Sequence, residues 1–168
     1  MKLIRSIVYI FDRAVDLFAA LGGILIILAI LIVAFEIVVR YFLDRPQIWV
    51  MDVTETILLY FTFLSTTWLL KKNGHVTMDI LVNRLNQRTQ DLLNIITSIL
   101  GAVISWALVW YGAQVTLDHF QRSVYVPTPL RLPTAPLLII IPIGSFLLLL
   151  QFLRRAYSYT VRWRMSFK

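Results

Sequence analysis

Cysteine is absent from the sequence, and charged residues are few. The lack of cysteine excludes disulfides, thiolate metal ligands and thiol redox chemistry. Charged residues make up 15% of the 168 residues and hydrophobic residues 59%, whereas soluble domains are about 25% charged. This composition does not fit a soluble domain and is typical of an integral membrane protein.

Histidine is almost as scarce, since only His75 and His119 occur. A four-helix membrane cytochrome needs pairs of axial histidines inside its spans, and both of these lie outside the long apolar blocks. Neither histidine has enough nearby ligands for zinc, and no phosphate-binding glycine loop or Ser/His/Asp set stands out. We therefore expect no enzyme activity, no metal site and no cofactor in this chain.

Four apolar blocks are each long enough to cross a bilayer core about 30 Å thick. We predict a single all-α membrane domain, 1–168, in which four helices span the membrane. The first block is too long for a signal-peptide core, so we expect it to be retained. Two amphipathic segments are predicted to lie in the membrane interface. The predicted spans are about 17–39, 53–70, 92–111 and 135–152, and the interfacial helices are about 3–16 and 77–91.

The distribution of basic residues predicts the orientation of the chain. With four spans, both termini lie on one side of the membrane together with the segment between the second and third spans. That side holds twelve of the sixteen Lys and Arg residues. The positive-inside rule therefore places both termini in the cytoplasm. This asymmetry also accounts for the net charge of +7, so no nucleic-acid partner is needed to explain it.

Two glutamates within the predicted spans are candidate functional groups. Glu36 lies near the outer end of the first span, and an intramembrane carboxylate is by default a candidate relay for protons or cations. Arg40 follows at i+4 and can neutralise it, which is the simpler interpretation. Glu55 lies inside the start of the second span, one turn after Asp52, whose place in the first turn suits the helix dipole.

Polar residues continue from Glu55 along the second span. A polar strip in lipid must face protein, so two interpretations carry equal weight: packing within a four-helix bundle, or contact with a second membrane protein. The strip consists of Tyr60, Thr62, Ser65, Thr66 and Thr67.

Two further features concern turns and breaks. His75 and Asp79 lie about one helical turn apart if a helix begins at Val76. Two ligands do not make a metal site, so a structural role is the better interpretation.

Prolines make the second external loop extended and stiff, and a plausible docking edge. Pro142 is expected to kink the fourth span.

Three motifs occur in a specific order along nearly the whole chain. They are Arg40-Tyr41-Phe42 followed by Pro46, Trp49 and acidic residues; Lys71-Lys72-Asn73-Gly74-His75-Val76 with Asp79; and Leu130-Arg131-Leu132-Pro133 followed by Ile141-Pro142-Ile143-Gly144. In this order they resemble the DctQ-type small membrane subunit of tripartite ATP-independent periplasmic (TRAP) transporters. One departure is Met51-Asp52, which stands where that family often has paired glutamates.

The resemblance implies a bacterial inner-membrane subunit that forms a static scaffold with a large elevator subunit. That transporter takes up an organic acid with sodium, after a periplasmic binding protein has delivered it. It also implies that the large subunit, which is a heterodimer partner or is fused to the small one in relatives, binds the sodium. The binding protein is then a transient partner, and membrane lipids surround the spans. Partner-interface candidates are Arg40, Trp49, Asp52, Glu55, Tyr60 and Arg131, and family landmarks are His75, Asp79, Pro133 and Pro142.

Two other functions compete with this one. A small stand-alone exporter would couple transport to protons through Glu36 or Glu55 and would work without any partner. A purely structural membrane protein of some other complex would use the same polar strip. The sequence shows no internal repeats and no broken helices at midplane, and this pattern indicates a scaffold rather than a pump.

Overall fold

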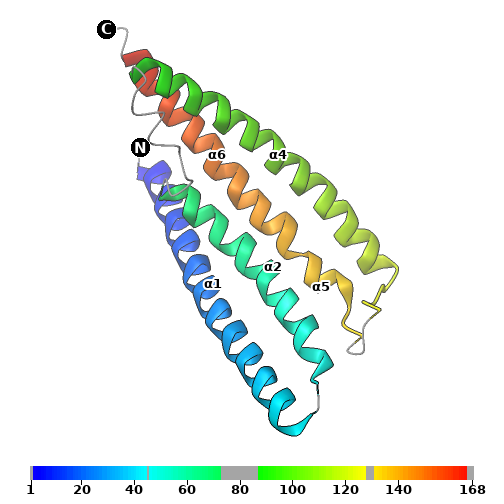
Figure 1. Ribbon diagram of the computed structural model, residues 1–168. Helices are drawn as coiled ribbons and strands as arrows, with labels where there is room; N and C mark the ends of the chain where they lie inside the picture. The colour runs from blue at the N-terminus through cyan, green and yellow to red at the C-terminus, as the bar shows by residue number, and fades with distance from the viewer. Residues whose placement is uncertain (1, 45, 73–86, 128–130, 166–168) are drawn as a thin grey trace.

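The computed structural model describes residues 2–44, 46–72, 87–127 and 131–165, and it is all-helical apart from short connections. Four helical stretches in these residues are long and apolar enough to cross a membrane, which confirms the predicted number of membrane-spanning helices. Each contains one of the four predicted spans. The helices are α1 (Lys2–Leu43), α2 (Ile48–Lys71), α4 (Gln87–Gln121), α5 (Thr134–Leu138) and α6 (Ile140–Met165), shown in Figure 1.

The predicted interfacial helices do not appear as separate elements in the described residues. Residues 3–16 are helical, but they form the first part of α1, which continues without a break through the first span. At 1.5 Å per residue its 42 residues extend about 60 Å, twice the thickness of a bilayer core. The other predicted segment, 77–91, lies outside the described residues except for its last part, which begins α4 at Gln87. Whether either segment lies in the interface stays a prediction.

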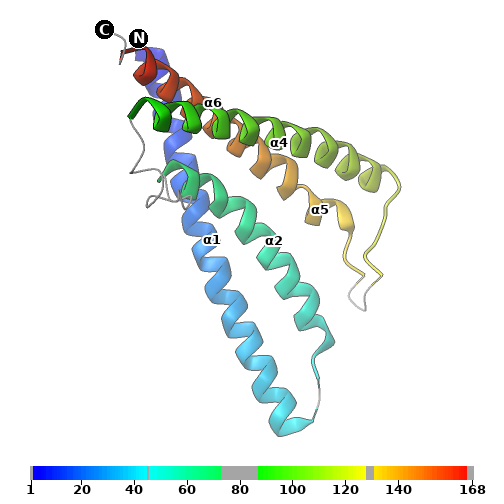
Figure 2. The same ribbon diagram turned by 45° about the horizontal axis from the view of Figure 1, so that its top comes forward.

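The helices are arranged as an open row rather than as a closed four-helix bundle. α1 packs on α2, α2 packs on α6, and α6 packs on α4, whereas α1 and α4 stand at opposite edges of the row. Two antiparallel hairpins, α1–α2 and α4–α5–α6, are therefore joined along a single seam between α2 and α6. Both termini lie at one end of the row, here called the terminus end, and the opposite end is called the loop end (Figure 2). Which end faces the cytoplasm stays a prediction.

Small polar residues line the contact between α4 and α6. Ser98 and Ser105 on α4 and Ser145 on α6 are all buried, and small side chains let membrane helices approach closely. Toward the terminus end, Arg155 donates from its Nη2 to Asn94 Oδ1 at 3.2 Å across the same contact. The α4–α6 hairpin is thus held by close packing and by polar contacts together.

The predicted kink at Pro142 is confirmed as a break between α5 and α6 at Ile139. Proline has no N–H to donate to Leu138, and its ring conflicts with the carbonyl of that residue, so the helix is interrupted one turn earlier. The connection that leads into α5 is extended: Val126 N donates to Leu132 O at 2.9 Å and Thr134 N donates to Val124 O at 3.0 Å. This pairing brings the connection back against the start of α5.

Ion pairs tie the two hairpins together at the terminus end. Arg154 Nη1 on α6 lies 2.6 Å from Asp12 Oδ1 on α1. Lys71 Nζ, at the end of α2, lies 2.8 Å from Asp16 Oδ1 and also donates to the Asp12 carbonyl at 3.0 Å. Three helices from both hairpins therefore meet in one cluster, Asp12, Asp16, Lys71 and Arg154, which we call the ion-pair cluster.

Asp12→Asn is expected to lower the free energy of unfolding by about 1 kcal/mol, because Arg154 would lose its charged partner between the hairpins. Asp118→Asn is the matched control, since Asp118 near the end of α4 pairs with Arg122 just after it, and such i, i+4 pairs contribute about 0.3–0.5 kcal/mol. Unfolding by SDS in mixed micelles measures both. An equal loss in the two variants would show that the cluster does not join the hairpins.

Candidate partner-binding face

One side of α2 remains uncovered even though this helix lies in the interior of the row. Glu55, Leu58, Thr62 and Leu69 are exposed, and their spacing of three, four and seven residues places them on one side of the helix. The other side packs within the chain through buried Ile57, Leu64, Thr67 and Leu70. We call the uncovered side the α2 face.

The polar strip predicted from the sequence is divided between these two sides. Thr62 is exposed on the α2 face and donates to Leu58 O at 2.8 Å, whereas Thr67 is buried within the chain. The Tyr60 hydroxyl donates to Pro136 O at 2.6 Å, so it joins α2 to α5. Packing within the chain is therefore confirmed for part of the strip, and contact of the outward-facing part with a second membrane protein stays a prediction.

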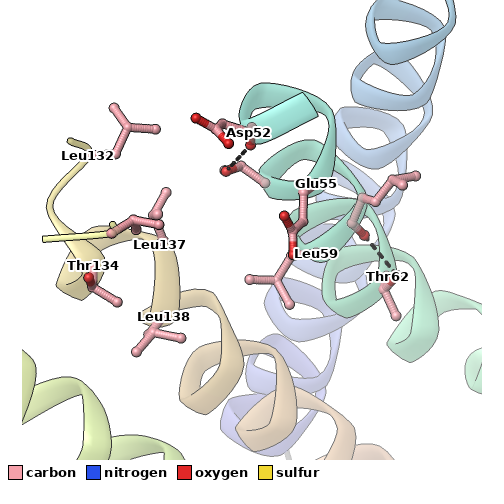
Figure 3. A pocket seen from close by; sticks show the side chains of 11 residues that line it. Asp52, Glu55, Leu59, Thr62, Leu132, Thr134, Leu137 and Leu138 are labelled. Atoms are coloured by element: carbon pink, nitrogen blue, oxygen red, sulfur yellow. Dashed lines mark hydrogen bonds between the residues drawn. The ribbon is translucent and has the colours of Figure 1, made fainter. Parts of the chain in front are cut away.

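A cleft of about 450 Å³ borders the α2 face at the loop end, between the start of α2 and α5 with its preceding connection. Its walls are mainly leucine and valine. Asp52 and Glu55 contribute two carboxylates, and Figure 3 shows the α2 side chains facing Leu132, Leu137 and Leu138 across the cleft. We call this space the α2–α5 cleft.

A second cleft, of about 730 Å³, lies on the other flank of the same part of α2, against the end of α1. Glu36 and Arg40 line it from α1, with Arg40 Nε 3.6 Å from Glu36 Oε1, so the predicted i, i+4 pairing is confirmed. Glu55 lines this cleft as well as the α2–α5 cleft. The carboxylate of Glu55 therefore stands on the ridge between the two spaces.

A groove of about 660 Å³ continues the α2 face toward the terminus end, between α1 and α2. Small residues of α1, Ala19, Ala20 and Gly23, form one wall, and a Cβ placed on Gly23 would meet nothing within 4 Å. Thr62 lines both this groove and the α2–α5 cleft. Clefts along most of the length of α2 thus share one face, which suits the docking of another membrane helix.

The remaining candidate residues lie at the loop end or outside the described structure. Trp49 donates from Nε1 to Gln47 Oε1 at 3.1 Å in the first turn of α2. Arg131 is exposed with a φ of 45° in the connection before α5. Pro133 is the N-cap of α5, whereas His75 and Asp79 lie outside the described residues.

The sequence interpretation missed two buried polar residues and the ion-pair cluster. Asp91, buried in the first turns of α4, and Gln151 on α6 were not singled out, nor was the ion-pair cluster. A charged residue near the end of a span has no sequence signal for its partner on another helix. These residues lie between helices rather than on the α2 face.

A comparison with known protein families matches most of the chain to a single family. Residues 29–161, from within α1 to near the end of α6, match the model of the DctQ family, described as tripartite ATP-independent periplasmic transporters, DctQ component. No curated protein matches the chain. The match covers the second and third membrane-spanning stretches, part of the first, most of the fourth, and the whole α2 face.

Proposed function

The chain belongs to the DctQ family of TRAP transporters, a family of transporter components rather than enzymes, and we propose that it acts as the static scaffold subunit of such a transporter. In this role it binds a large elevator subunit in the bacterial inner membrane. The large subunit binds sodium and moves the substrate, an organic acid that a periplasmic binding protein delivers.

The observation that carries this proposal is the uncovered α2 face. A helix with neighbours on both flanks still exposes Glu55 and Thr62 within a membrane span, and polar groups in lipid are costly unless protein covers them. The row of helices offers broad surfaces to a partner and, in its described part, is not wrapped around a central space. An open row of this kind can serve as a fixed surface along which another subunit moves.

We place the large subunit on the α2 face and the periplasmic binding protein at the loop end. The connection before α5 holds Arg131 in an exposed position there. An exposed basic side chain in a proline-rich connection suits transient docking of a soluble protein, because rim charges mainly set association rates. This assignment follows the predicted orientation, in which the loop end faces the periplasm.

The stand-alone exporter is the competing function, and the structure offers it less support. Glu36, one of its two candidate relay residues, is already paired with Arg40. Glu55 remains as a relay candidate, but it stands on the ridge between two open clefts rather than in an enclosed path. The family match also assigns the chain to a transporter made of several components.

The test is to express the tagged chain together with a large TRAP membrane subunit and to purify it in mild detergent. We expect a stable one-to-one complex, and uptake into liposomes only when both subunits and the binding protein are present. The chain alone is expected to transport nothing. Recovery of the chain without the large subunit, or transport by the chain alone that is lost in Glu36→Gln or Glu55→Gln, would contradict the proposal.

A further inference from the structure

The two clefts at the loop end carry an excess of negative charge. Glu36, Asp52 and Glu55 line them with three carboxylates, and Arg40 is the one cationic side chain among their lining residues. Arg40 is paired with Glu36 rather than with Asp52 or Glu55. Among the described residues, the carboxylates of Asp52 and Glu55 therefore have no cationic partner. Carboxylates at the edge of an apolar cleft within a span are costly unless a cation, hydrogen-bond donors or protonation stabilises them.

The α2–α5 cleft is also rich in hydrogen-bond acceptors and poor in donors. Asp52 Oδ2, which can only accept, and the Thr134 hydroxyl, which can donate or accept, are buried and have no hydrogen-bond partner. Thr56 and Thr62 already donate their hydroxyl hydrogens to backbone carbonyls, at 2.9 and 2.8 Å, so their oxygens can only accept. A group with several N–H donors and a positive charge is the chemical complement of this lining.

The position of the cleft indicates whether the cationic group belongs to a soluble protein or to a membrane helix. Its lining on α2 extends from Asp52 to Thr62, about 15 Å along the helix, and the whole of this stretch lies within a membrane-spanning helix. A soluble protein does not reach that depth, whereas a neighbouring membrane helix runs alongside it. The apolar walls suit the aliphatic stem of a long basic side chain, whose charged end then reaches the carboxylates.

We propose that the α2–α5 cleft receives a lysine or arginine side chain from a membrane helix of the large subunit, at the level of Asp52 and Glu55. This inference rests on the proposed function and adds the chemistry of the contact. The basic group pairs with both carboxylates and satisfies Asp52 Oδ2. Formation of this contact selects a partner helix that has its charge at the matching depth, because any other register leaves the carboxylates unpaired.

The first experiment measures how much of the large subunit stays bound to the tagged chain during washing in mild detergent. Asp52→Asn combined with Glu55→Gln is expected to reduce retention at least tenfold, because the isosteric amides remove both charges but keep the shape. Asp118→Asn is the control, since this carboxylate also lies near the loop end but is already paired with Arg122 four residues along the chain. Equal retention by the double variant and the wild type overturns the inference.

The second experiment identifies the basic group by exchanging the charges. Glu55→Lys is expected to abolish retention, and a Lys→Glu or Arg→Glu change at one position in a span of the large subunit is expected to restore it. If no such change restores retention, the inference is wrong. Asp52-dependent binding of phosphatidylethanolamine, but not of phosphatidylcholine, to the chain alone also overturns it by assigning the cleft to an amine headgroup. If the wild-type chain retains no large subunit, the proposed function itself fails.

Discussion

Replacing Gly144 with alanine is expected to push the two helical hairpins apart. A Cβ at this position would lie 2.7 Å from Phe63 Cβ and 3.2 Å from Phe63 O. Neither atom can move away by a rotation of the phenylalanine ring, so α2 and α6 must separate. These two helices form the main contact between the hairpins, and the Tyr60–Pro136 hydrogen bond and the ion-pair cluster add only local contacts to it.

The expected cost is about 3 kcal/mol of unfolding free energy, at the upper end for overpacking a tight contact. Unfolding by SDS in mixed micelles measures this loss. The separation itself can be measured between spin labels on Met51→Cys and Gln121→Cys, two exposed positions on different hairpins. Because the chain has no cysteine of its own, the labels attach only at these sites. The distance between them should increase.

Gly23→Ala is the matched control, because it is the same substitution in another membrane-spanning helix, at a position where a Cβ meets nothing within 4 Å. Its stability should equal or slightly exceed that of the wild type, since alanine favours the helix over glycine by about 1 kcal/mol. If Gly144→Ala resembles Gly23→Ala in both stability and label distance, α2 and α6 do not form the seam described here.

Replacing Thr62 with tryptophan is expected to abolish assembly with the large subunit while leaving the chain folded. Thr62 is exposed at the centre of the α2 face and lines both the α2–α5 cleft and the groove between α1 and α2. A tryptophan there would project from the α2 face where the two spaces meet and would prevent a partner helix from approaching. Retention of the large subunit after washing should fall by more than tenfold, with unchanged elution of the free chain from a sizing column.

Thr97→Trp is the control for this prediction. Thr97 is also exposed and also donates to the carbonyl four residues before it, but it lies on α4 at the far edge of the row. Its substitution should leave retention unchanged. Loss of the partner in Thr97→Trp but not in Thr62→Trp would move the binding surface from α2 to α4.

The features that the sequence predicted are those that depend on residues close together in the chain. The number of membrane-spanning helices followed from long apolar blocks. The break before Pro142 and the pairing of Glu36 with Arg40 followed from spacings of three or four residues. In each case the cause lies within one or two helical turns.

The arrangement of the helices was not predictable in the same way. In a membrane the lipid-facing side of a helix is as apolar as its packed side, so hydrophobic patterning does not show which helices are neighbours. The open row, the α2–α6 seam and the contact between Arg154 and Asp12 all join residues distant in sequence. For the same reason the sequence could not divide the polar strip between buried Thr67 and exposed Thr62.

The divergence of α1 and α4 toward the loop end has a consequence for the surrounding lipid. These edge helices come closest at the terminus end, beside the ion-pair cluster, and spread apart toward the other end (Figures 1 and 2). In a membrane we expect the isolated chain to leave more space for lipid between its edge helices in the leaflet at the loop end. Under the proposed function, a large subunit that occupies this space would replace that lipid, so that the packing of lipid around the chain would also favour the assembled transporter.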